Sequence, residues 1–283
     1  MANLSPLRYP GGKDKTYKYV QYLIQENNLT TYIEPFAGGA AVALRLLLNN
    51  DVRRIIINDY DRSIYALWHT IKTNHRALIE RIQNTEITIE EWRNQKNVQL
   101  TKATANELDL AFSTLFLNRT NRSGIIKAGV IGGQAQNGDY RLDCRFNKKA
   151  IIERIEAIAA RAKDIKVYNL DAQEFITTVI KRTRKSLTFF DPPYYDKGPD
   201  LYTNFYDHDD HVELANTIKS SMKNRYWILT YDIAEQIREM YDKYEPKIYH
   251  LNYSIAKPTK GQEFIFFSNK VAPGDIASYL NIV

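Results

Sequence analysis

Residues 31–59 read TYIEPFAGGAAVALRLLLNNDVRRIIIND, and this stretch decides the fold class. It begins with a β-branched and aromatic run, residues 31–36, that stops at the pair Gly38-Gly39. The Ala/Leu-rich residues 40–48 are typical of a helix, and the apolar residues 54–58 are typical of a buried strand. Strand, glycine turn, helix and strand in this order predict a parallel α/β sheet.

The same alternation continues on both sides of a long interruption. Residues 64–82 predict an amphipathic helix, and about residues 85–164 contain helical stretches and loops without a convincing core strand. Two capping-box patterns, Thr88-x-x-Glu91 and Thr104-x-x-Glu107, are expected to start helices there. Further elements are expected in this order: helix 146–163, strand 165–170, helix 172–182, strand 187–191, helix 208–222, strand 226–231, helix 233–241, and an antiparallel pair over 249–255 and 263–268.

The length of 283 residues suits one large domain or one domain with an insertion. We therefore expect an α/β fold with a mostly parallel sheet and a closing antiparallel strand pair. Its catalytic domain would comprise residues 1–70 and 165–283. A mostly helical insertion would occupy residues 71–164.

Bulk composition excludes several classes of protein. Apolar residues make up 44% of the chain and charged residues 25%, as in ordinary globular proteins, so disorder is not indicated. The net charge of +6 only weakly favours a polyanionic partner. The single cysteine, Cys144, excludes an internal disulfide and fits a reducing compartment. Without an apolar signal region or a bilayer-length apolar run, we expect a cytoplasmic protein with no membrane partner.

The glycine turn at residues 34–40 predicts half of a nucleoside site. Glycines between a first strand and a first helix let the backbone approach a ligand closely. Asp59 follows Gly38 by 21 residues, near the ~20 expected for an acid that accepts the ribose hydroxyls. The missing third glycine favours a ligand shorter than a dinucleotide. A plain turn with a capping acid stays open as the alternative.

Residues 189–194, FFDPPY, predict the chemistry. They end a predicted strand, at the sheet edge where such folds bind ligands. The lone pair of an aromatic amine is delocalised, so acceptors on its two hydrogens would favour a tetrahedral, nucleophilic nitrogen. Asp191 offers a carboxylate and Pro192 a backbone carbonyl, and the two prolines hold both acceptors in place. Tyr194 offers a flat face on which a base could stack.

These motifs resemble the Dam-like family of adenine-specific DNA methyltransferases. The resemblance rests on RYPGGK at residues 8–13, EPFAGG at 34–39 and DPPY at 191–194, in the order of the alpha group of amino-methyltransferases. Asn118-Arg119 and Ser123-Gly124 look like that family's Asn-Arg and Ser-Gly stretch. The resemblance covers Arg8 to about Ser268, although Tyr9 stands where the family often has Trp.

The resemblance implies a Rossmann-like methyltransferase sheet with an inserted target-recognition domain. It also implies S-adenosylmethionine as methyl donor, no metal, and the N6 amino group of a flipped-out adenine as acceptor. The implied catalytic residues are Asp191, Pro192, Pro193 and Tyr194. The implied cofactor-binding residues are Tyr9, Lys13, Glu34, Phe36, Gly38, Asp59, Asp171 and Asp191.

The insertion contains a segment in which arginines alternate with glycines and asparagines. Arginine and asparagine can contact phosphates and base edges, so we expect this segment to bind double-stranded DNA; a solvated loop is the alternative. The expected DNA-binding residues are Asn118, Arg119, Arg122, Arg141 and Arg145. We further expect a bacterial or phage-encoded monomer, or a weak dimer on DNA, with a companion restriction endonuclease as an option.

Alternatives remain at this point. The loop chemistry barely separates adenine from cytosine N4, and a glutamine methyltransferase would more often have Asn at position 191. A DNA-binding protein without activity would be expected to have lost one of Lys13, Asp59 or Asp191, and all three are present. The run His208-Asp209-Asp210-His211 could bind a metal, but we interpret its acids as capping the following helix.

Overall fold

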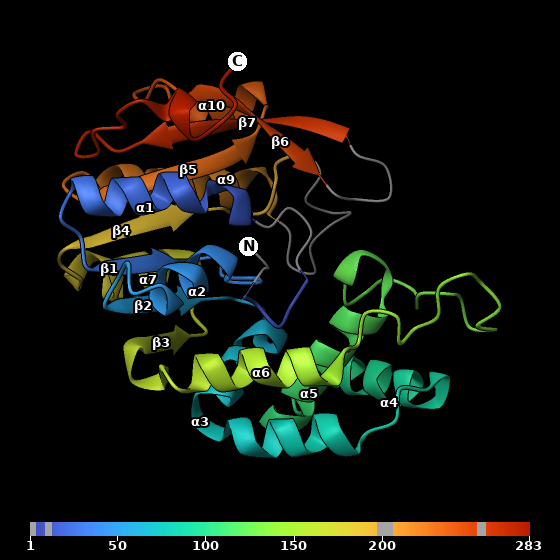
Figure 1. Cartoon of the computed structure of the whole chain (residues 1–283). Coiled ribbons are helices and arrows are strands. Elements are labelled where there is room, and N and C mark those ends of the chain that lie inside the picture. The colour runs from blue at the N-terminus through green and yellow to red at the C-terminus, as the bar shows by residue number, and fades with distance from the viewer. Residues whose placement is uncertain (1–3, 9–12, 197–205, 254–258) are drawn as a thin grey trace.

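The computed structural model describes residues 4–8, 13–196, 206–253 and 259–283. Its centre is a seven-stranded sheet in the order β3-β2-β1-β4-β5-β7-β6 (Figure 1). The strands are β1 (Thr31–Glu34), β2 (Arg54–Asn58), β3 (Ile165–Tyr168), β4 (Ser186–Phe190), β5 (Tyr226–Asp232), β6 (Lys247–Tyr253) and β7 (Thr259–Phe267). Strands β1 to β5 pair in parallel, and β7 pairs antiparallel with both β5 and β6. The predicted mostly parallel sheet with a closing antiparallel pair is confirmed.

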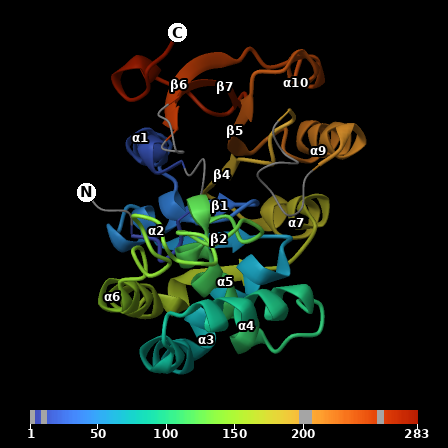
Figure 2. The same cartoon turned by 90° about the vertical axis from the view of Figure 1, so that its right-hand side faces the viewer.

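Helices cover both faces of this sheet. Figure 2 shows α1 (Tyr17–Glu26) and α2 (Ala41–Leu48) on one side, and α7 (Ala172–Thr178), α9 (His208–Ser221) and α10 (Glu235–Met240) on the other. Short 3-10 turns are η1 (Lys13–Thr16), η2 (Arg122–Gly124), η3 (Ala162–Asp164), η4 (Ile180–Arg182) and η5 (Ile276–Ser278). Parallel strands covered on both faces are apolar without interruption. Accordingly, Ile56 of β2 packs into one core, and its neighbours Ile55 and Ile57 pack into the other.

The insertion consists of helices that lie beyond the β3 edge of the sheet (Figure 1). They are α3 (Arg62–Asn84), α4 (Ile89–Leu100), α5 (Glu107–Thr120) and α6 (Lys148–Ala159). Helix α3 runs through the expected boundary at residue 71 and is kinked at Asn74. Every residue from Leu110 to Thr120 of α5 is buried, so this helix is enclosed on all sides.

Of the two predicted capping boxes, one lies at the start of a helix and the other does not. Thr88 caps α4 by accepting from the Glu91 N–H, as expected. The capping box expected at Thr104 is wrong, because α5 begins at Glu107 and the Asn106 side chain accepts from the Leu108 N–H (2.9 Å). Asparagine is the stronger N-cap, and Thr104 instead closes a backbone turn with Thr101.

Candidate active site

The expected site lies where the order of the strands reverses. β1 and β4 are adjacent parallel strands, with β2 beyond the first and β5 beyond the second. In open α/β sheets, ligands bind at the carboxyl ends of strands at this switch point. The glycine turn follows β1 and the Asp191 loop follows β4, so the topology places the two predicted motifs next to each other.

Asp191 is held from one side, and its other side is open. Lys13 Nζ lies 2.8 Å from Asp191 Oδ1, and the Thr230 hydroxyl donates to the same oxygen (2.7 Å). Among the described residues, none donates a hydrogen bond to Asp191 Oδ2 or to the carbonyl oxygen of Pro192. Burial raises the pKa of Asp191, Lys13 opposes this shift, and the nearby charge of Glu263 adds to it. These two oxygen atoms are the ones that the sequence predicts as acceptors for an amine, and that role stays a prediction.

Tyr194 is anchored by its hydroxyl. That hydroxyl donates to Glu263 Oε1 (2.5 Å), and Lys13 Nζ lies 5.3 Å from the ring centroid. The residue is only 3% exposed, so the face that was expected to stack on a base is covered in this structure. The stacking role stays a prediction. Pro192 and Pro193, which belong to the same loop, are buried.

Glu263 on β7 is a site residue that the sequence did not reveal. It is fully buried, and it accepts from the hydroxyls of Tyr194 and Tyr249 (2.5 and 2.6 Å). Its Oε2 also lies 3.4 Å from Lys13 Nζ. The available signal was a carboxylate at the start of an apolar run, EFIFF at residues 263–267. Its partner Lys13 lies 250 residues away in the sequence. No local pattern predicts such a contact.

Asp59, the predicted second half of the nucleoside site, lies against the glycine turn. Its Oδ2 accepts from the Gly38 N–H (2.8 Å), and its Oδ1 accepts from the Asp61 N–H (2.9 Å). Gly38 has a φ of 44°, a conformation that glycine adopts readily. Burial raises the pKa of Asp59 to about 7, and the charge of Asp61 adds to this, while the Gly38 N–H opposes it. The acid therefore titrates near neutral pH.

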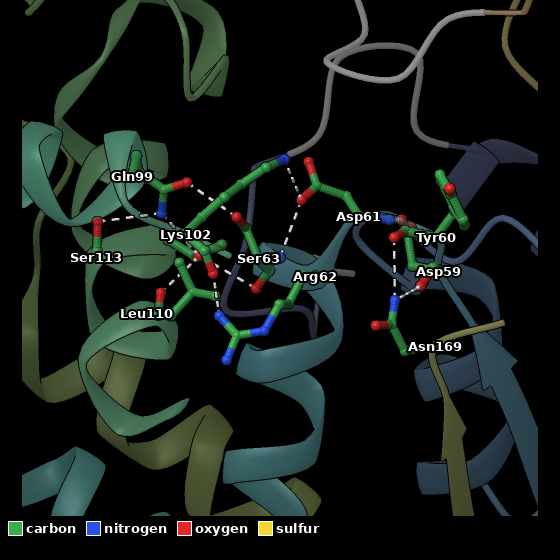
Figure 3. Close-up of polar contacts among 11 residues, drawn as sticks. Asp59, Tyr60, Asp61, Arg62, Ser63, Gln99, Lys102, Leu110, Ser113 and Asn169 are labelled. Atoms are coloured by element: carbon green, nitrogen blue, oxygen red, sulfur yellow. Dashed lines mark hydrogen bonds and ion pairs between the residues drawn. The ribbon is translucent and has the colours of Figure 1, made fainter. Parts of the chain in front are cut away.

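The surroundings of Asp59 connect the sheet to the insertion (Figure 3). The Asn169 amide donates to the carbonyls of Asp59 and Tyr60 (2.8 and 3.0 Å). On the other side, Lys102 Nζ lies 3.0 Å from Asp61 Oδ1 (Figure 3). Lys102 follows α4, so a residue of the insertion neutralises the acid that raises the pKa of Asp59.

The structure gives Glu34 and Asp171 local partners. Glu34 accepts from the Ala43 N–H (3.1 Å) at the start of α2, and burial raises its pKa to about 8. Asp171 caps α7 through the Gln173 N–H (2.8 Å). Both therefore have structural roles, and their cofactor contacts stay predictions.

The other two expected cofactor residues differ in what the structure says of them. The Phe36 ring packs edge-on against Tyr206 with ring centroids 6.0 Å apart, at the same end of the sheet. Tyr9 lies outside the described residues.

The five expected DNA-binding residues divide into two groups. Asn118 and Arg119 are 2% and 8% exposed, and their side chains bond to the backbone of the N-terminal segment. In this structure these side chains are not on the surface, and their role as DNA contacts stays a prediction. Arg122, Arg141 and Arg145 are exposed, and within the described residues their side chains form no ion pair or hydrogen bond. Their segment, residues 121–145, projects as a green loop from the insertion in Figure 1.

The described residues contain no group of three or more His, Cys, Asp or Glu side chains suited to hold a metal. Asp210 instead completes a capping box with Asp207 at the start of α9, as the acids of that run were expected to do. His211 is buried with its Nδ1 2.8 Å from the Tyr231 hydroxyl. Among all the residues that the structure describes, no helix has the length and apolar character needed to cross a membrane.

The sheet order and the Asp-Pro-Pro-Tyr loop at its switch point define a Rossmann-like methyltransferase fold. The family model for the D12 class N6 adenine-specific DNA methyltransferases matches residues 9–256. The chain belongs to this family, and it is an adenine-specific DNA methyltransferase.

Three curated relatives, each named as a type II methyltransferase, match this chain along most of their length. The type II methyltransferase M.CviBI of Paramecium bursaria Chlorella virus NC1A is 25% identical, with 87% of this chain and 90% of the relative covered. The type II methyltransferase M.MjaIII of Methanocaldococcus jannaschii is 23% identical, covering 74% and 77%. The type II methyltransferase M1.LlaDCHI of Lactococcus lactis subsp. cremoris is 22% identical, covering 84% and 85%.

Proposed function

We propose that the protein methylates the N6 amino group of an adenine flipped out of duplex DNA at a specific sequence, with S-adenosylmethionine as donor. The open acceptor pair of Asp191 Oδ2 and the Pro192 carbonyl carries this proposal. Two acceptors fixed by prolines fit the two hydrogens of an exocyclic amine. A labelled methyl transfer assay on unmethylated DNA, followed by nucleoside analysis, tests it, and N6-methyladenine is the expected product.

In this mechanism the protein orients the target amine and stabilises the positive charge that develops on its nitrogen. Asp191 and Pro192 accept the amine hydrogens and favour a tetrahedral nitrogen whose lone pair points away from the ring. Burial and the nearby Glu263 raise the pKa of Asp191, and Lys13 opposes this shift and so favours the ionised form. The amine nitrogen takes the methyl group as the sulfur–methyl bond of the donor breaks, and it is cationic until one of its hydrogens leaves as a proton. An acceptor already in place would stabilise that charge without reorganisation.

The residues at the ends of β1 and β2 fit S-adenosylmethionine. Asp59 presents a carboxylate to ribose hydroxyls, and the Gly38 backbone approaches closely because it has no side chain. The exposed Tyr60, 63% accessible, adds a flat aromatic surface directly after the ribose acid. When bound, the cofactor supplies an electrophilic methyl group.

Replacing Asp59 by asparagine is expected to weaken S-adenosylmethionine binding and to remove its pH dependence near neutrality. The pKa of Asp59 is raised to about 7, so the carboxylate that accepts both ribose hydroxyls predominates only above that pH. Wild-type affinity should therefore fall as the pH is lowered through about 7. Calorimetric titration with the cofactor on both sides of that pH checks this, with DNA affinity as the control. A variant with unchanged cofactor affinity would exclude the ribose contact.

The loop 121–145 suits DNA recognition by charge and by exposure. Arg122, Arg141 and Arg145 are exposed, and Tyr140, next to Arg141, is 72% exposed. Arginines contact phosphates or read base edges, and apolar or aromatic side chains can wedge between bases that are being unstacked. We therefore propose the insertion, residues 71–164, as the target-recognition domain.

Alanine substitution of Arg122, Arg141 and Arg145 in turn is expected to separate base reading from phosphate contact. An arginine that reads a base should cost ~1–3 kcal/mol and relax preference at one position. One that contacts a phosphate should weaken binding to all sequences and lower the salt dependence. Methylation of a library of single-base site variants measures both effects. If all three variants keep wild-type preference and salt dependence, this loop is not the recognition surface.

The relatives are named as type II methyltransferases, and this supports a proposal on the biological setting. We propose that this protein is the modification enzyme of a restriction-modification system. It would act as a monomer, with a companion restriction endonuclease. Methylome sequencing of a methylation-deficient strain that expresses it would identify the site. Sedimentation with and without a duplex carrying that site would give the oligomeric state.

A further inference from the structure

The N-terminal segment before the active site is held by side chains of the insertion. The Arg8 N–H donates to Asn118 Oδ1 (2.8 Å), and Asn118 Nδ2 donates back to the Arg8 carbonyl (2.8 Å). The Arg119 guanidinium donates to the Pro6 carbonyl through Nε (2.7 Å) and also through Nη2. The amide of Asn118 thus bonds to both the N–H and the carbonyl of Arg8, as a residue on a neighbouring strand would.

The fit around Arg8 is close on a second side. Asn118 Nδ2 also donates to the Gly124 carbonyl (2.8 Å), and a Cβ built on Gly124 would lie 2.4 Å from the Arg8 carbonyl oxygen. Gly124 has a φ of +79°, so a side chain is disfavoured there by conformation as well as by space. Arg154 of α6 adds a hydrogen bond to the Ser5 carbonyl (3.2 Å). Helices α5 and α6 therefore bind the segment from two sides.

The charged side chain of Arg119 is buried, which is energetically unfavourable. It is 8% exposed, and among the described residues it forms no ion pair with a carboxylate. Burial, together with the charges of Arg154 and Arg8, lowers the pKa of Arg119 to about 10. Burial of an unpaired charge destabilises a fold, and an apolar side chain would fill the space at lower cost. A residue kept under these conditions is expected to serve function.

The held segment leads directly into the active site. Lys13 follows Arg8 by five residues, a length that spans at most ~18 Å when fully extended. Lys13 in turn lies 2.8 Å from Asp191 Oδ1. One end of this short connection is therefore bound to the insertion, and the other is part of the catalytic centre.

We propose that Asn118 and Arg119 are positioning residues that couple DNA binding by the insertion to cofactor binding at the N-terminal segment. The inference rests on the proposed function, in which the insertion binds DNA and Lys13 borders the cofactor site. A shift of the end of α5 on DNA moves the backbone of residues 6–8, and with it Lys13. Such coupling is reciprocal, so DNA and cofactor each raise the affinity for the other by the same factor.

The test measures the affinity for S-adenosylhomocysteine, a cofactor product that cannot react, with and without a duplex carrying the methylation site. The wild-type ratio of the two dissociation constants is expected to lie in the range of about 5–150. Arg119→Lys keeps the charge but loses the planar fork, and Asn118→Asp loses the donor to Arg8 and Gly124. Both should bring the ratio close to one, while affinity for DNA alone stays near the wild-type value. Arg76→Lys, an exposed residue of α3, is the matched control and should keep the wild-type ratio.

A wild-type ratio of one, or an unchanged ratio in both variants, would overturn the coupling. Loss of DNA binding in the absence of cofactor would also overturn it, because the pair would then act at the DNA surface. Failure of the proposed function is recognised separately, since the wild-type protein would then bind no duplex at all. Melting curves of the two variants establish whether each is folded. If only one of them folds, the ratio of that variant decides the outcome.

Discussion

Asp191→Ala is expected to lower the methylation turnover by about 10²–10³-fold while leaving the protein folded. The substitution removes one of the two acceptors for the amine hydrogens, at the atom where charge develops. The Pro192 carbonyl remains, so the target can still bind, but its nitrogen is no longer held in the nucleophilic geometry. Single-turnover methylation of a duplex that carries the site measures this step apart from product release.

The fold should survive because Asp191 sits at the partly open rim of the site, with a side chain that is 29% exposed. Its loss leaves Lys13 paired with Glu263 rather than alone. Asp242→Ala, an exposed acid beyond α10, is the matched control and should retain full turnover. Turnover of Asp191→Ala at the wild-type rate would remove this loop from the mechanism.

The fold could be predicted because its determinants are local. The apolar strands, the glycine turn after β1 and the Asp-Pro-Pro-Tyr loop after β4 each lie within a few residues, and parallel topology then brings the two loops together. Strand ends differed by up to four residues. Strand β1, for example, ends before Phe36, since Pro35 cannot donate to the ladder. The start of α5 was misplaced because Thr104 and Asn106 both satisfy capping patterns, and the neighbouring turn decides between them.

The parts of the site that could not be predicted depend on long-range contacts. Asn118 and Arg119 have the residue types of DNA contacts, but α5 is enclosed on all sides and turns them toward the N-terminal segment. Glu263 has no motif at all. Its role depends on β7 lying next to β5 in an antiparallel register, which places a strand residue beneath a loop that follows β4.

Glu263→Gln is expected to destabilise the protein by about 3 kcal/mol and to impair catalysis through Tyr194 and Lys13. The buried carboxylate accepts from two tyrosine hydroxyls and lies beside Lys13, and an amide can replace only part of this because one of its atoms is a donor. Denaturant unfolding measures the first effect. Glu245→Gln, an exposed glutamate before β6, should leave stability and turnover unchanged.

Two further measurements separate positioning by Glu263 from a general loss of stability. Glu263 raises the pKa of Asp191, so its replacement should move the acidic limb of the turnover–pH profile to lower pH. If Glu263 acts by holding the Tyr194 hydroxyl, the variant that combines Glu263→Gln with Tyr194→Phe should be no slower than the slower single variant, since both remove one interaction. Additive losses together with an unmoved acidic limb would limit Glu263 to a structural role. An unmoved limb is the sharper result, because loss of stability alone does not change the ionisation of Asp191.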